Sequence, residues 1–386
     1  MKWKSLFVCA LALPALVFAS PVFVRKPLTR FSSRSEMQQR IRAAGFKTHG
    51  GIDKAKTKKD DDDPARSFPH FTQSFVYNGQ EFPYTMVGYQ PRSGKSTTVR
   101  PVIIPLRMRF QFFEQDATFE PDIAVNNILA SPIFNDAQFA NGTGQFGDQL
   151  QRATFWNKMD DKRRWHVRFS KPRVLDTVDV LVEPDIGDLF ATGDPNFPFI
   201  GDVRFGAMDS TIHTILQFAD VQPDELPVFV TYNVFADALG YHDAFVVGSK
   251  HGNDILQTLV YTSWLEEELV GSLLADISTI NHEVGEWLND PYVNNIVTTW
   301  MYPPPDDPRT VCSFNPFLEV GDPQGNGPTF NDFPTVVIPL NGFNYHLQDL
   351  VMLPWFTGEV PSSAQNGWYD FPGTNQIHQP FVPCPG

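Results

Sequence analysis

The chain has 386 residues and carries 30 Lys or Arg against 44 Asp or Glu, a formal net charge of −14. Hydrophobic residues make up 42% of the chain and charged residues 19%, which is typical of a globular protein rather than a disordered one. Because phosphate contacts dominate nucleic-acid binding, this acidic balance argues against a nucleic-acid partner, and against anionic lipid surfaces for the same reason. The 33 prolines and 34 phenylalanines favour short strands and fixed loops over a helical bundle.

Residues 1–19 have the features of a secretory signal peptide. Lys2 and Lys4 precede an apolar run from Leu6 to Phe18, and the pattern predicts cleavage after Ala19. The run is too short to anchor the chain in a membrane. We therefore expect export to the periplasm or the extracellular space, with no membrane association after cleavage. The alternative is a buried N-terminal helix.

Two cysteines remain once the signal is removed, Cys312 and Cys384. In an oxidising compartment they are expected to form a disulfide that ties the C-terminal tail back to a loop. Two free thiols are the alternative. Neither cysteine has the spacing of a thiolate zinc site.

Residues 20–66 differ in composition from the rest, with twelve Lys or Arg, six Asp or Glu, and a block of opposed charges at 56–63. Such a segment cannot build a core, and we interpret it as a linker or a propeptide. Its basic character would let it dock on the acidic remainder of the chain. A disordered spacer is the alternative.

Residues 67–185 form a β-rich N-terminal portion. Alternating and β-branched segments predict strands, with one short helix at 148–156 among them. The predicted strands are 74–77, 84–87, 97–99, 102–110, 165–169 and 178–182.

Residues 186–386 have a different pattern, which predicts a helix at 210–218 and strands at 226–232, 240–247 and 257–262. The strongest helix prediction is 272–289, ended by Asp290 and Pro291. Its apolar residues fall on one stripe, which predicts that this side of the helix faces a core. The stripe consists of Leu273, Ile277, Ile280, Val284 and Leu288.

His282 and Glu286 are four residues apart on this helix, so their side chains share one face. This is the spacing of the HExxH metal helix with the second histidine replaced by glutamate, and both side chains can reach one Zn²⁺. Glu283 lies where a general base would take a proton from metal-bound water. Gly285 suggests that something approaches the helix closely. The alternative is a solvated polar face without a metal.

A catalytic zinc usually has three protein ligands, so a further one is needed. Asp290 lies about 12 Å along the axis from His282 at 1.5 Å per residue, too far for a straight helix to bring both to one ion. We therefore expect Asp290 to orient a ligand or to shape the turn into Pro291. Glu319 is the preferred third ligand, and Asp322 beside the same turn is its rival.

The block from Asn281 to Pro291 resembles the HExxE and Asp-Pro signature of secreted zincin-like metallopeptidases. Those proteins are similar in having a Tyr-His strand before the helix, and after it a Glu-hydrophobic-Gly-Asp segment and a Tyr-x-x-Gln segment followed by tryptophan. The matching residues here are Tyr241, His242, Glu319 to Asp322, Tyr345 to Gln348, and Trp355. The resemblance covers about residues 226 to 356.

The resemblance implies an α+β fold in which a zincin-like metal-binding domain with an active-site helix, residues 186–386, follows the β-rich portion. It implies one Zn²⁺, or another divalent metal, on His282, Glu286 and Glu319. Glu283 would take the proton of the attacking water and pass it to the leaving amine of a peptide or protein substrate.

An extended peptide would lie along the strand at 241–247 by β-augmentation. His242 or His346 would serve as an oxyanion donor, unless each is a packed structural histidine. The competing function is that of a secreted binding or structural protein whose metal helix is vestigial or purely structural.

Overall fold

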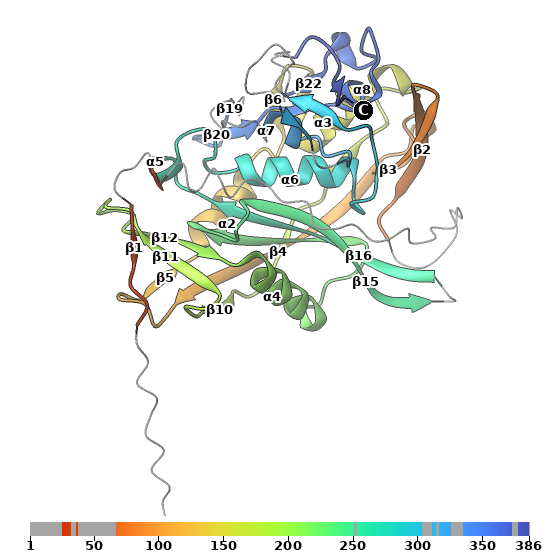
Figure 1. Ribbon diagram of the computed structural model, residues 1–386. Coiled ribbons are helices and arrows are strands. Elements are labelled where there is room, and N and C mark those ends of the chain that lie inside the picture. The colour runs from red at the N-terminus through yellow and green to blue at the C-terminus, as the bar shows by residue number, and fades with distance from the viewer. Residues whose placement is uncertain are drawn as a thin grey trace, which may run out of the picture.

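The computed structural model describes residues 25–31, 36–37, 67–250, 253–302, 311–313, 316–325, 335–372 and 377–385. Its centre is a sheet with helix α6 (Ser278–Asn289) across one face and helix α4 (Phe205–Phe218) across the other (Figure 1). The strand order of the sheet is β10 (Val178–Val182), β4 (Thr97–Phe110), β13 (Glu225–Tyr232), β16 (Asn253–Trp264) and β15 (Gly240–Lys250).

Strands β10, β4, β13 and β16 pair in parallel, and β15 joins β16 antiparallel at the end of the order. In the register of the two middle strands, Ile103 lies opposite Val228. Both strands are apolar over most of their length because a parallel strand covered on both faces has no solvent side. Shorter strands also pair with β4, namely β5 (Ala117–Phe119), β8 (Val167–Phe169) and β9 (Arg173–Val174).

The remaining elements surround this sheet. A second sheet contains β1 (Thr29–Arg30), β11 (Gly187–Ala191), β12 (Phe199–Val203) and β14 (Val234–Phe235). Smaller pairings join β2 (His70–Tyr77) with β3 (Gln80–Val87), β6 (Ala137–Phe139) with β7 (Gly142–Gly144), β19 (Thr335–Leu340) with β20 (Phe343–Gln348), and β21 (Leu350–Val351) with β22 (Asp370–Phe371). Strand β17 (Trp300–Tyr302) lies between β18 (Val311–Cys312) and β23 (Val382–Pro383). The other helices are α2 (Asp122–Ala130), α3 (Phe146–Thr154), α5 (Glu267–Val270), α7 (Asp322–Gly325) and α8 (Leu353–Thr357).

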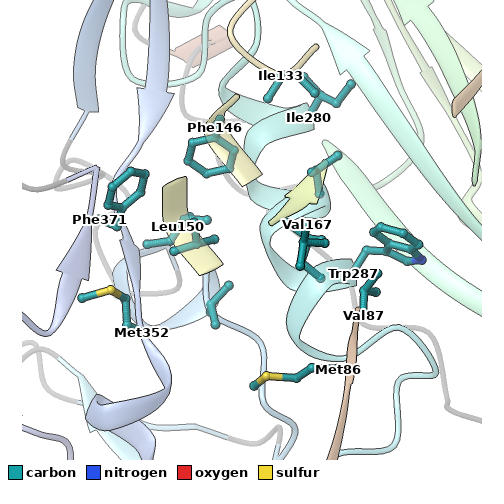
Figure 2. Packing of buried hydrophobic residues seen from close by; sticks show 14 of the residues in the cluster. Met86, Val87, Ile133, Phe146, Leu150, Val167, Ile280, Trp287, Met352 and Phe371 are labelled. Carbon is teal, nitrogen blue, oxygen red and sulfur yellow. The ribbon is translucent and has the colours of Figure 1, made fainter. Parts of the chain in front are cut away.

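The largest apolar cluster encloses α6 (Figure 2). Ile280 and Trp287 of this helix belong to the same buried cluster as Phe146 and Leu150 of α3. The Trp287 indole also donates to Thr258 Oγ1 of β16 at 3.0 Å, which fixes the helix on the sheet. Every residue of α6 is buried, so the helix has no solvated polar face.

Helix α6 begins at Ser278, not at residue 272 as the periodicity predicts. Asp276 has a φ of 46°, in the left-handed region that interrupts a right-handed helix. Its carboxylate accepts the main-chain N–H of His346 at 3.0 Å, so a contact from a distant strand fixes this turn. The other two predicted helices are present with shifted ends, as α3 and α4.

The mixture of strands and helices agrees with the predicted α+β class. The predicted boundary after residue 185 falls within one sheet, because β4 precedes it and β13 follows it and the two strands are paired. The two predicted portions therefore share a sheet and a core. A zincin-like assignment of the second portion stays a proposal.

Cys312 and Cys384 form a disulfide across 72 residues, which confirms the predicted link between the C-terminal tail and a loop. A disulfide fits an oxidising compartment. Among the described residues, no helix is long and apolar enough to cross a membrane.

The predicted signal, residues 1–19, lies outside the described residues. Part of the basic segment that follows is described, and it docks on acidic residues as its charge suggests. Lys26 Nζ pairs with Asp188 at 2.7 Å and Arg25 pairs with Asp116 at 3.2 Å. Whether this segment acts as a linker or a propeptide stays a prediction.

Candidate metal centre

Helix α6 brings three ionisable side chains of the HExxE motif into the interior. His282 is fully buried, and Glu283 and Glu286 are 1% and 2% exposed. Such groups are rarely buried unless they are paired or bind a metal. Each polar atom of the buried motif therefore needs a hydrogen-bond partner, an opposite charge or a metal.

The first group of ligand atoms is His282, Glu286 and Asp322, the last at the start of α7. His282 Nε2 lies 3.0 Å from Glu286 Oε1 and 3.8 Å from Asp322 Oδ1. The three candidate ligand atoms lie within 4.8 Å of one another. One nitrogen and two carboxylate oxygens suit Zn²⁺, and the carboxylates also suit harder divalent ions.

The other nitrogen of the His282 ring is held by Gln348 at the end of β20. His282 Nδ1 donates to Gln348 Oε1 at 2.8 Å, and Gln348 Nε2 donates to the main-chain oxygen of Gly321 at 2.8 Å. Metal-binding histidines typically donate their second N–H to such an acceptor, which fixes the ring and directs the other nitrogen at the ion. Gln348 thus orients Nε2 toward Glu286 and Asp322.

The segment before Asp322 approaches the ring so closely that only glycine fits at position 321. A Cβ on Gly321 would lie 2.3 Å from His282 Nδ1. The Gly321 N–H also donates to Glu286 Oε1 at 3.1 Å. Gly321 therefore brings the loop that carries Asp322 against the two helix residues.

The second group is His242, Glu283 and Glu286, with His242 contributed by the edge strand β15. His242 Nδ1 lies 3.4 Å from Glu283 Oε2 and 3.6 Å from Glu286 Oε2. Its Nε2 donates to the main-chain oxygen of Asp290 at 3.1 Å, which leaves Nδ1 to face the two carboxylates. Alternation along β15 explains the placement: Tyr241 packs on Phe205 of α4, so His242 faces α6.

Gly240 makes room for the Glu283 carboxylate. A Cβ at this position would lie 2.8 Å from Glu283 Cγ and 2.8 Å from its Oε1. The approach predicted at Gly285 is also present, although an apolar side chain makes it: a Cβ there would lie 2.3 Å from Leu350 Cδ1.

Burial and mutual charge shift the pKa values within the two groups in different directions. Burial raises the pKa of Glu283 well above its usual range, and the carboxylates of Glu286 and Asp322 raise it further. Burial would also raise the pKa of Glu286, but the imidazoles of His282 and His242 hold it below its usual range. Without a metal, Glu283 therefore holds a proton more firmly than Glu286 does.

The pKa values of the two histidines also shift in opposite directions. Burial lowers the pKa of His282, but the charge and hydrogen bond of Glu286, together with Asp322, outweigh it and raise the value above its usual range. For His242, burial dominates and lowers the pKa in spite of Glu286. His282 thus holds a proton more firmly than His242 does, and an ion binding at Nε2 would compete with that proton.

Of the two predicted third ligands, only Asp322 joins a group that could hold a metal. Glu319 is 2% exposed but belongs to neither group. The Asp290 carbonyl accepts from His242 Nε2 at 3.1 Å, and its carboxylate accepts the main-chain N–H of Asn294 at 2.9 Å; its predicted role in orienting a metal ligand stays a prediction. His346 pairs with Asp276 at 2.6 Å and lies in neither group.

Sequence reasoning missed three features of this centre. It treated His242 as an oxyanion donor or a packed structural histidine and not as a metal ligand, and it assigned no role to Gly321 or Gln348. Gln348 and Gly321 do lie within the two downstream segments that carry the resemblance. The resemblance of those two segments was therefore the signal that could have pointed to both residues.

A third group that could hold a metal lies on the α4 side of the sheet. It consists of Asp209 and His213 of α4 and Asp243 of β15. Its histidine side chain is 30% exposed, so this group is closer to the surface than the other two.

Comparison of the chain with protein-family models, with curated proteins and with solved structures finds no match. The similarity to zincin-like metallopeptidases therefore rests on the residues quoted above. What the structure adds is a buried set of His, Glu and Asp side chains that could hold a metal.

Proposed function

We propose that this chain is an exported metal-dependent hydrolase that cleaves peptide bonds at the His282 centre. The observation that carries the proposal is the arrangement around His282. Its Nε2 faces two carboxylates while its Nδ1 is fixed by Gln348. Metal-binding histidines typically have such a second contact, which fixes the tautomer and the orientation of the ring.

His282, Glu286 and Asp322 would hold the ion. A divalent ion there would supply Lewis acidity, which polarises a carbonyl and lowers the pKa of bound water. The N,O,O donor set fits Zn²⁺ and does not exclude a harder divalent metal.

Glu283 is the proton acceptor in this proposal. It follows His282 on the helix, and burial raises the pKa of its carboxyl well above the usual range. A raised pKa brings a carboxylate closer to the operating pH, where a general base is most effective. Glu283 would take the proton from the attacking water and return it to the leaving amine.

The position of strand β15 favours a peptide as the substrate. It lies at the end of the strand order described for the sheet and carries His242 on the face toward α6. An extended peptide could add to this edge through main-chain hydrogen bonds. His242 and His346 stay candidates for an oxyanion donor, although each ring already has one partner. His242 donates to the Asp290 carbonyl, and His346 pairs with the Asp276 carboxylate.

A second candidate function is favoured by the burial of the centre. Catalytic zinc sites keep one open position, whereas structural sites are closed. His282 is 0% exposed and Asp322 is 5% exposed. An exported binding protein stabilised by a purely structural metal would have such a closed centre.

Glu283→Gln separates the two functions. The hydrolase proposal expects the ion at His282 to be retained while cleavage of a peptide library is lost. Asp322→Asn should lose that ion, and the matched change Glu319→Gln should keep it. A chain that binds metal but cleaves no peptide, with or without Glu283, would favour the structural function and contradict the hydrolase.

A further inference from the structure

Glu286 belongs to both groups of ligand atoms through different oxygens. Its Oε1 lies 3.0 Å from His282 Nε2, and its Oε2 lies 3.6 Å from His242 Nδ1. A carboxylate that presents one oxygen to each of two groups is the arrangement of a bridging ligand. Two-metal centres hold their ions about 3.5–4 Å apart, a separation that one carboxylate can span.

Each histidine is set for a metal in the same manner. The nitrogen that faces away from the carboxylates donates to a fixed acceptor, which is Gln348 Oε1 for His282 and the Asp290 carbonyl for His242. In both rings the remaining nitrogen therefore faces the carboxylates. Such second contacts are typical of metal-binding histidines, and here they occur twice.

Glu283 supplies an independent observation. The side chain is 1% exposed, and its Oε1 has no hydrogen-bond partner among the residues that the structure describes. Within those residues, the short side-chain nitrogen contacts of Glu283 and Glu286 are to the imidazoles of His242 and His282, and no Lys or Arg pairs with either carboxyl. A buried carboxylate oxygen without a partner is costly, and a cation bound by this carboxylate would offset the cost.

From these contacts we propose that the centre binds two divalent ions bridged by Glu286. The first is the ion on His282 and Asp322, and the second lies on His242 and Glu283. The inference rests on the proposed function only in taking the His282 group as the first site.

The second ion would change what Glu283 does. With one ion bound, its carboxyl is free to exchange protons with the attacking water. With two ions bound, the same carboxylate is a ligand. Occupancy of the second site would therefore regulate hydrolysis at the first, and metal in excess would inhibit it.

The test is a zinc titration of the mature protein, read as bound ions per chain by equilibrium dialysis and elemental analysis. We expect two ions in the unchanged protein and one in His242→Ala. The matched control is His346→Ala, which removes a buried histidine from its carboxylate partner outside both groups and should leave two.

If the unchanged protein binds one ion per chain, and this ion is lost in His282→Ala but kept in His242→Ala, the proposed second ion is refuted and the proposed function stands. Two ions without any peptide cleavage would overturn the function and leave the second ion. If His213→Ala, not His242→Ala, removes the second equivalent, that ion lies on the α4 group and the proposal fails.

If His242→Ala does not fold, the unchanged protein can still test whether two ions are bridged. Titrated with Mn²⁺, a carboxylate-bridged pair gives a spin-coupled electron paramagnetic resonance spectrum at two equivalents. A spectrum of isolated Mn²⁺ at every ratio would overturn the bridge.

Discussion

Replacing Gln348 by alanine would remove the side chain that accepts the hydrogen bond of His282 Nδ1. Two hydrogen bonds are lost, from His282 Nδ1 to Gln348 Oε1 at 2.8 Å and from Gln348 Nε2 to the Gly321 carbonyl at 2.8 Å. Gln348 is 1% exposed, so water is poorly placed to replace either bond.

The size of the effect follows from what is left behind. A buried polar group without a partner costs about 1–3 kcal/mol, so the two groups together should lower the metal-free stability by about 2–6 kcal/mol. Loss of such a contact to a metal-binding histidine typically weakens metal affinity roughly 10- to 100-fold. We expect a zinc affinity lower by this factor, because the ring is free to turn away from Glu286.

Gln145 offers a matched control away from the centre. It is also a buried glutamine, and its Nε2 donates to the carbonyls of Phe134 at 2.9 Å and Phe169 at 3.0 Å. Gln145 Oε1 also accepts the Phe169 main-chain N–H at 2.8 Å, so Gln145→Ala should lower the stability at least as much, without changing zinc affinity. Urea unfolding of the metal-free proteins measures the first quantity, and competition with a zinc chelator measures the second. Equal zinc affinities in the two variants would refute the role of Gln348.

Three further predictions concern the loop, the helix end and the disulfide. Gly321→Ala puts a Cβ 2.3 Å from the fixed His282 ring, so zinc affinity should fall at least roughly tenfold and stability by about 1–3 kcal/mol; unchanged chelator competition would contradict this. Burial raises the pKa of Asp290 from 3.8 to about 7, so its ionisation destabilises the metal-free protein as the pH rises from about 4 through 7, by on the order of 4 kcal/mol. Asp290→Asn should flatten that part of the stability curve, measured by urea unfolding, and parallel curves for the two proteins would contradict the assignment. Replacing Cys312 and Cys384 by serine opens a 72-residue link and should cost about 4 kcal/mol in the same assay; unchanged stability would count against it.

The sequence predicts those parts of the centre that depend on local geometry. His282 and Glu286 are brought together by the helical repeat alone, whatever surrounds the helix. The direction of His242 follows from alternation on β15, once it is known which helix covers which face. The five strands in the order of the central sheet were also predicted, because β-branched runs such as β4 are long and clear, whereas most of the short strands outside that order were not.

Features that depend on long-range contacts could not be predicted. The polar face of α6 is buried because segments distant in sequence cover it, among them β20, whose Gln348 main chain bonds to Asn281 on the helix. The choice between Glu319 and Asp322 depends on the path of one loop against His282. Periodicity does not encode that path, although Gly321 permits it.

The measurement that tests the central claim most directly is the metal content of the purified mature protein, determined by elemental analysis beside His282→Ala. We expect tightly bound divalent metal, at least one ion per chain, and loss of the ion at the His282 group in the variant. Absence of metal after zinc is supplied and the excess removed would contradict it. The buried histidines and carboxylates would then be a paired polar core and not a metal centre.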